Sequence, residues 1–154
     1  MKVCGEKMRK IYLAGSCGST ERTQMVQIAE FIRSKGFEVY CPFELKIPNA
    51  WDIRQEVWAY KVFKEDKKAI DDCDMMIVIS VGQVSTAGTN WEQGYAHAKG
   101  KWLAVFQITD EPTSLMTYCG CTTFVNSSRD TIIEDLKLFF EGKARTGKCT
   151  TVLT

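Results

Sequence analysis

The sequence predicts an α/β fold, a three-layer α/β/α sandwich around five parallel strands in the order 2-1-3-4-5. Short apolar runs alternate with amphipathic stretches along the chain, as they do in a doubly wound sheet. The strands are expected at Lys10–Ala14, Phe37–Cys41, Met75–Ser80, Trp102–Phe106 and Thr123–Val125. Right-handed crossovers make this flavodoxin-like or Rossmann-like order the simplest winding.

Helices are expected where apolar residues recur at spacings of three and four. These stretches are Glu21–Lys35, Trp51–Asp72, Asn90–Lys99 and Asp130–Phe140. In the predicted winding the strand order reverses between the first and third strands. The loops that follow Ala14 and Ser80 therefore flank one crevice, which is where sheets of this type bind ligands.

Length and composition limit the classes of function. The 154 residues suit one domain, 1–154, with loose tails at 1–9 and 142–154. A net charge of +1 argues against a nucleic-acid polymer as partner. The chain has no apolar run long enough for a membrane span and no signal-peptide pattern, so a cytoplasmic location is expected. Seven scattered cysteines are interpreted as reduced thiols, and one histidine leaves a zinc site short of ligands; no metal or cofactor is expected.

The stretch between the third and fourth strands, Gly82–Lys101, contains a carboxylate with two possible roles. The spacing Thr89-x-x-Glu92 fits a capping box, in which the glutamate reaches back to the first amide of the helix. The positive end of the helix would then keep Glu92 ionised. A carboxylate nucleophile also has to be ionised. Spacing alone leaves the cap and the catalyst equally open.

Asp66 lies at the centre of the apolar stripe of the expected helix 51–72. A carboxylate there has either a buried partner or a place at the rim of a polar pocket, because burying it unpaired is costly. A raised pKa would make Asp66 a candidate general acid, whereas an ion pair with Arg54 or a lysine of the same helix is the alternative. Tyr12, on the first strand, either points its hydroxyl into the same crevice or packs in the core.

The small-residue loop from Gly15 to Thr20 is either a phosphate cradle or a tight turn between a strand and a helix. It matches neither GxGxxG nor the P-loop pattern. His97 lies five residues after Glu92, about 140° around the helix axis, and is interpreted as structural. The tryptophans at positions 51, 58 and 91 are interpreted as core or rim residues rather than a stacking platform.

Four segments between about Ile11 and Gly120 resemble the nucleoside 2-deoxyribosyltransferase family. They are IYLAG at 11–15, IRQEVWAYKVFKEDKKAI at 53–70, DCDMMIVIS at 72–80 and GTNWEQGYAHAKGK at 88–101. The last is the most specific, because the family has G-[TS]-x-x-E-x-G-[YF] there. The resemblance implies that Glu92 is the nucleophile that holds a covalent deoxyribosyl ester, that Tyr12 positions it, and that Asp66 manages the proton on the base.

Two departures from the family pattern concern the 5′ end of the sugar. Many transferases have aspartate where this chain has Thr86, and an N-L-M segment from the neighbouring subunit where it has Ser114-Leu115-Met116. Hydroxyl residues at these places resemble the related 2′-deoxynucleoside 5′-monophosphate N-hydrolases, whose phosphate-facing loop also matches Gly15-Ser16. Losing the carboxylate removes repulsion toward a phosphate dianion. The helix around IRQEVW resembles the transferases instead.

The resemblance therefore implies an enzyme that cleaves the N-glycosidic bond of a 2′-deoxynucleoside or its 5′-monophosphate, with a modest preference for the monophosphate. The sugar passes to another base or to water. The substrate-binding residues are expected to be Gly15, Ser16, Thr86, Gly88 and Ser114. A homodimer or larger homo-oligomer with shared sites follows if Ser114 serves a neighbour. The alternatives are an N-glycosidase for NAD-type nucleotides and a non-catalytic nucleotide sensor.

Overall fold

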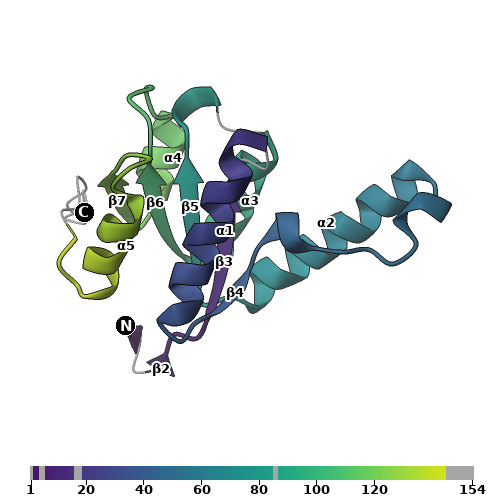
Figure 1. Ribbon diagram of the computed structural model, residues 1–154, viewed down its shortest axis with the longest axis horizontal. Helices are drawn as coiled ribbons and strands as arrows, with labels where there is room; N and C mark the ends of the chain where they lie inside the picture. The colour runs from purple at the N-terminus through teal and green to yellow at the C-terminus, as the bar shows by residue number, and fades with distance from the viewer. Residues whose placement is uncertain (1, 4–5, 16–18, 85–86, 145–154) are drawn as a thin grey trace.

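The computed structural model describes residues 2–3, 6–15, 19–84 and 87–144 (Figure 1). Within them, the main sheet has five strands in the order β4-β3-β5-β6-β7, and each neighbouring pair is parallel. The strands are β3 (Lys10–Gly15), β4 (Glu38–Tyr40), β5 (Met75–Ser80), β6 (Trp102–Gln107) and β7 (Thr123–Asn126). The predicted fold class and strand order are confirmed. A short antiparallel pair, β1 (Lys2–Val3) and β2 (Glu6–Lys7), lies outside this sheet, where the sequence predicts no strand.

Helices cover both faces of the sheet. Side chains of α1 (Ser19–Ser34) and α5 (Ile132–Phe140) pack in one core cluster. The opposite cluster contains side chains of α2 (Gln55–Asp72), α3 (Ala87–Ala98) and α4 (Leu115–Gly120). Short 3-10 turns lie at Pro42–Glu44, Ala50–Asp52 and Gly82–Val84. Among the described residues, no helix is both long and apolar enough to span a membrane.

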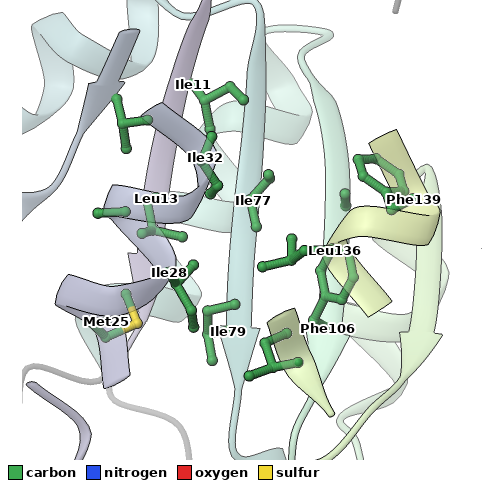
Figure 2. Packing of buried hydrophobic residues seen from close by; sticks show 14 of the residues in the cluster. Ile11, Leu13, Met25, Ile28, Ile32, Ile77, Ile79, Phe106, Leu136 and Phe139 are labelled. Carbon is green, nitrogen blue, oxygen red and sulfur yellow. The ribbon is translucent and has the colours of Figure 1, made fainter. Parts of the chain in front are cut away.

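The alternation of side chains along the strands assigns each residue to one of the two clusters. Ile11 and Leu13 of β3 pack toward α1 and α5, in the cluster that Figure 2 shows. Tyr12 and Ala14, which alternate with Ile11 and Leu13 along the strand, belong to the opposite cluster with side chains of α2 and α3. All six residues of β5 are buried, as is typical of a central parallel strand. Strand alternation therefore turns Tyr12 toward the helices that carry Asp66 and Glu92.

Helix α2 extends well beyond the edge of the sheet (Figure 1). Its last turns pack on the sheet through Ile70, which is fully buried. Its earlier turns leave large apolar side chains exposed, namely Val57, Trp58, Tyr60 and Phe63. Trp51, in the turn before α2, is 100% exposed, so the interpretation of this residue as core or rim is wrong.

The loops after β5 and β6 are fastened to each other. The Gln83 amide donates to the Pro112 carbonyl at 2.9 Å, and the Gly82 amide donates to Ser80 Oγ at 3.2 Å. Gln107, at the end of β6, accepts hydrogen bonds from the hydroxyls of Ser80 and Thr113 and donates to the Glu111 carbonyl. These contacts hold the loop between β5 and α3 against the loop between β6 and α4.

We predict that Gly82→Ala destabilises the protein more than Gly36→Ala. Both glycines have a positive φ, +83° and +86°, which costs an alanine about 1–2 kcal/mol. A Cβ at Gly82 would also lie 2.6 Å from Glu111 Cβ and 3.0 Å from the Glu111 carbonyl oxygen, whereas a Cβ at Gly36 meets no atom within 4 Å. Urea unfolding of the two variants measures the difference. Equal losses would contradict the close packing of the two loops.

Candidate active site

Tyr12 connects the sheet to helix α3 through a hydrogen bond. Its side chain is 0% exposed, and its hydroxyl donates to Glu92 Oε1 at 2.8 Å. Glu92 is the sixth residue of α3, so it lies on the second turn of the helix and faces the sheet. The two residues are 80 positions apart in the sequence, and the hydrogen bond holds the carboxylate in one place.

The capping-box interpretation of Thr89-x-x-Glu92 is wrong. Helix α3 begins at Ala87 rather than Asn90, so Thr89 is the third residue of the helix and not its N-cap. A capping box needs its Ser or Thr at the N-cap, three residues before the glutamate. In the structure the Glu92 carboxylate instead accepts the hydroxyl of Tyr12 from the sheet.

Asp66 is anchored in the same way by a second tyrosine. The hydroxyl of Tyr40, the last residue of β4, donates to Asp66 Oδ1 at 2.7 Å. In the described part of the chain no ion pair involves Asp66, so the alternative of a pair with Arg54 or a nearby lysine is wrong. Sequence reasoning missed Tyr40. A signal was present, since Phe37-Glu38-Val39-Tyr40 and Lys10-Ile11-Tyr12 alternate alike on adjacent parallel strands.

The two tyrosines are direct neighbours. Tyr12 and Tyr40 are paired in register across β3 and β4. Their rings are stacked, with centroids 5.4 Å apart and planes at 24°. Two carboxylates from different helices, Glu92 of α3 and Asp66 of α2, are therefore held by adjacent phenols on one sheet.

Burial shifts the acid–base behaviour of all four groups. It raises the pKa of Glu92 to about 7, an effect that the Tyr12 hydrogen bond opposes and the charge of Asp66 reinforces. Burial also raises the pKa of Asp66, against the Tyr40 hydrogen bond. The pKa values of Tyr12 and Tyr40 rise as well, so both phenols stay protonated and donate. The helix end was expected to keep Glu92 ionised; desolvation instead raises its pKa, so near neutral pH the carboxyl is partly ionised.

Glu92 and Asp66 line one cavity of about 410 Å³ between α2 and α3. Its other lining residues are Trp58, Ala59, Val62, Phe63, Gly88 and Trp91. The rings of Phe63 and Trp91 lie 5.2 Å apart, and Trp58 and Trp91 are 41% and 46% exposed. The sequence interpreted these two tryptophans as core or rim residues; in the structure they form walls of the cavity. Exposed aromatic faces beside polar groups suit a planar heterocyclic ligand.

The predicted glycines have different surroundings. Gly88 lines the cavity, and a Cβ there would meet no atom within 4 Å, so this wall stays open beside Glu92. Gly15 ends β3, where a Cβ would lie 2.8 Å from Met25 Cε and 3.3 Å from the Ile79 carbonyl oxygen, so Gly15 packs closely against α1 and β5. Ser16 and Thr86 lie outside the described residues, so the structure does not describe the predicted phosphate cradle or the 5′ contact.

Ser114 is not brought to this cavity within a single chain. It precedes α4 and lines a different cavity of about 500 Å³ between α3 and α4, together with Gln93 and His97. His97 Nδ1 lies 2.8 Å from the Gly120 carbonyl oxygen, so the histidine contacts the end of α4. The sequence predicted a structural role for it.

Comparison with known proteins relates the chain to one family. Residues 11–142 match the family model described as nucleoside 2-deoxyribosyltransferase. A 2-deoxyribosyltransferase from the psychrotolerant bacterium Bacillus psychrosaccharolyticus has 29% identity and a TM-score of 0.69, over 80% of this chain and 90% of that one. No curated protein matches the chain.

Two further solved structures share the fold. The CMP N-glycosidase of Clostridium botulinum has 20% identity and a TM-score of 0.63, over 84% of this chain and 100% of that one. A conserved protein from Enterococcus faecalis V583 has 21% identity and a TM-score of 0.66, over 86% and 99% of the two chains. At these identities the likeness concerns the fold alone.

We predict that Glu92→Gln stabilises the protein at alkaline pH. The folded-state pKa of Glu92, about 7, is above its ordinary value of 4.5, so the folded state binds more protons between those values. The free energy of unfolding of the wild type therefore falls as pH rises from 4.5 to 7, and the neutral amide of the variant removes that fall. At pH 8 the variant should gain about 3 kcal/mol, and at pH 4 little.

Urea unfolding at pH 4, 6 and 8 measures this difference. Glu30→Gln, at an exposed position of α1, serves as the control and should show no comparable gain. The same difference between wild type and Glu92→Gln at all three pH values would contradict the raised pKa.

Proposed function

The chain belongs to the nucleoside 2-deoxyribosyltransferase family, and we propose that it cleaves the N-glycosidic bond of a 2′-deoxynucleoside or its 5′-monophosphate through a deoxyribosyl ester of Glu92. One observation carries the proposal. Glu92 and Asp66, each bound by a tyrosine hydroxyl, line a single cavity with exposed aromatic walls. Such a pair supplies a nucleophile and a proton donor to one ligand.

In the first step a Glu92 oxygen attacks the anomeric carbon, and the bond from that carbon to the base nitrogen breaks. The oxygen that Tyr12 does not bind is the one that attacks. The transition state is oxocarbenium-like, and the neighbouring carboxylate stabilises its positive charge. Burial raises the pKa of Glu92 to about 7, which reflects poor solvation of the anion, so bonding to a cationic carbon relieves an unfavourable charge.

Asp66 supplies the proton that the departing base requires. Burial favours its neutral form by raising its pKa, and a neutral carboxyl can donate to the leaving nitrogen. In the second step water or another base attacks the same carbon, the ester bond to Glu92 breaks, and Asp66 takes the proton of the incoming group. Two displacements retain the anomeric configuration.

The aromatic side chains at the mouth of the cavity offer a place for the base. Trp58 and Phe63 come from α2 and Trp91 from α3, and all three are partly exposed. Trp91 is held by a stacked contact with Tyr95 at 5.3 Å, so its ring is oriented before a ligand arrives. A purine or pyrimidine stacked against these rings would keep its glycosidic bond near the two carboxylates.

The 5′-monophosphate is the preferred substrate in this proposal. Thr86 stands where many family members have an aspartate, and its hydroxyl lacks the charge that would repel a phosphate dianion. Ser114 stands where they have an asparagine and offers a second hydroxyl. Ser114 lines a different cavity from Glu92 in one chain, so it is proposed to reach the site of a neighbouring copy. Leu115 and Met116 beside it are 79% and 82% exposed, and such apolar residues suit an interface.

We predict that the wild type, mixed with deoxynucleosides and their 5′-monophosphates, gains the mass of a deoxyribosyl group or its phosphate. Glu92→Ala and the near-isosteric Glu92→Gln should gain no mass and lose base release by about three orders of magnitude or more. Intact-protein mass spectrometry and chromatography of the free base measure the two effects. The mass of the adduct distinguishes the nucleoside from the monophosphate. Full base release by Glu92→Ala would rule out the mechanism.

We predict that the active protein sediments as a dimer or larger assembly. Replacing both exposed apolar residues, Leu115→Ser with Met116→Ser, should release folded monomers and lower activity by about tenfold or more, because Ser114 is then absent from the neighbouring site. Sedimentation velocity and circular dichroism check assembly and folding. A monomeric and fully active protein would refute shared sites without affecting the proposed chemistry.

A further inference from the structure

We propose that Tyr40 is a positioning residue for the proton transfer at Asp66. Its phenol fixes Oδ1 of Asp66 as a hydrogen-bond acceptor, which leaves the transferable proton to Oδ2, the oxygen that meets the base. The inference rests on the proposed function, because it assigns a residue to the proton step of that reaction.

The geometry of the contact carries the inference. The Tyr40 oxygen lies 2.7 Å from Asp66 Oδ1, within the usual range for an O–H···O hydrogen bond. A neutral carboxyl has one carbonyl oxygen, which accepts, and one hydroxyl oxygen, which donates. In the neutral form of Asp66 the carbonyl oxygen is the better acceptor, so the Tyr40 hydrogen bond to Oδ1 favours the tautomer with the proton on Oδ2. One hydrogen bond therefore selects both the rotamer of Asp66 and the location of its proton.

The surroundings of Tyr40 make it a rigid anchor. Its backbone pairs with Tyr12 in the sheet, and its ring is stacked on the ring of Tyr12. Asp66 lies on α2, a helix whose first turns extend beyond the sheet (Figure 1). The Tyr40 hydrogen bond thus connects Asp66, on the projecting helix, to β4. The neighbouring strand β3 carries Tyr12, whose hydroxyl binds Glu92. Residues of this kind affect the rate because they hold the reacting groups within a fraction of an ångström of the productive geometry.

A purely structural role for the phenol predicts different behaviour. In that case the hydroxyl only satisfies its own hydrogen-bonding need, and removing it lowers stability without changing how the rate depends on pH or on the leaving base. Ser127 offers a comparison, because its hydroxyl donates to Asp135 Oδ2 on α5 at 2.6 Å, and neither residue lines the cavity.

The pH profile separates the two roles. The reactive state has Glu92 ionised and Asp66 neutral, so kcat/KM falls when the pair holds two protons and when it holds none. The last proton leaves near the pKa of Glu92, about 7. The charged groups that face the pair include Glu65 on α2, and the phenols of Tyr12 and Tyr40 lie beside it. Because the Tyr40 hydrogen bond lowers the pKa of Asp66, its loss lets the pair keep a proton to higher pH.

The decisive experiment compares Tyr40→Phe, Asp66→Asn, Ser127→Ala and Glu92→Ala on two substrates. One is deoxyguanosine or its 5′-monophosphate, whichever the wild type cleaves faster. The other is its N7-methylated form, whose cationic base departs without needing a proton. Phenylalanine keeps the ring that stacks on Tyr12, and circular dichroism with urea unfolding verifies folding.

Tyr40→Phe should lower kcat on the ordinary substrate by about tenfold and Asp66→Asn by about 100-fold, while both stay within about twofold of wild type on the methylated substrate. The alkaline limb of kcat/KM should move to higher pH in Tyr40→Phe and vanish in Asp66→Asn. Ser127→Ala should lose stability, as Tyr40→Phe does, and keep the wild-type rates and profile.

Two results would overturn the inference. One is a Tyr40→Phe variant with wild-type rates on the ordinary substrate while Asp66→Asn is impaired. The other is an equal loss by Tyr40→Phe on both substrates, which would indicate a general structural defect. Failure of the proposed function looks different, because Glu92→Ala would then cleave both substrates at the wild-type rate.

Discussion

The partial burial of two carboxylates that line one cavity is the constraint on which the rest of the site depends. An ionised carboxylate is costly to remove from water, and a single tyrosine hydroxyl offsets only part of that cost. The result is a pKa of about 7 for Glu92, to which the charge of Asp66 contributes, and a raised pKa for Asp66. Near neutral pH the pair therefore retains a proton that isolated side chains would lose. This behaviour suits a site that must offer one anion and one acid to the same ligand.

The geometry of that pair comes from the sheet more than from the helices. Parallel pairing of β3 with β4 sets Tyr12 beside Tyr40, and strand alternation turns both phenols toward α2 and α3. The helices then deliver one carboxylate each. A slip of one residue in the β3–β4 register would separate the two rings and remove one anchor, because the side-chain period of a strand is two. The register of β3 and β4 thus determines whether the catalytic groups proposed here can act together.

In a single chain, large apolar side chains on α2 and α4 are exposed to solvent. The first turns of α2 expose Trp58, Tyr60 and Phe63 beyond the sheet, and Leu115 and Met116 are exposed at the start of α4. Apolar side chains grouped in this way are typical of contact surfaces. Ser114 lies beside a different cavity from Glu92, on the far side of α3 from the nucleophile. Both observations support the proposed assembly, in which neighbouring copies complete each other's sites.

The sequence by itself determined the strands, their order and the identity of the two carboxylates, because apolar periodicity is local and the crossover rule leaves few windings. Glu92 and Asp66 were visible as carboxylates whose positions needed an explanation. Their partners were decided only by tertiary structure. Glu92 binds a tyrosine 80 positions away, and Asp66 binds Tyr40 rather than Arg54 or a lysine on its own helix. The start of α3 at Ala87 likewise removed the capping box. Trp51, interpreted from the sequence as a core or rim residue, is fully exposed in the turn before α2. Local pattern records which side chains share a face, whereas hydrogen bonds between distant segments depend on how the strands and helices pack.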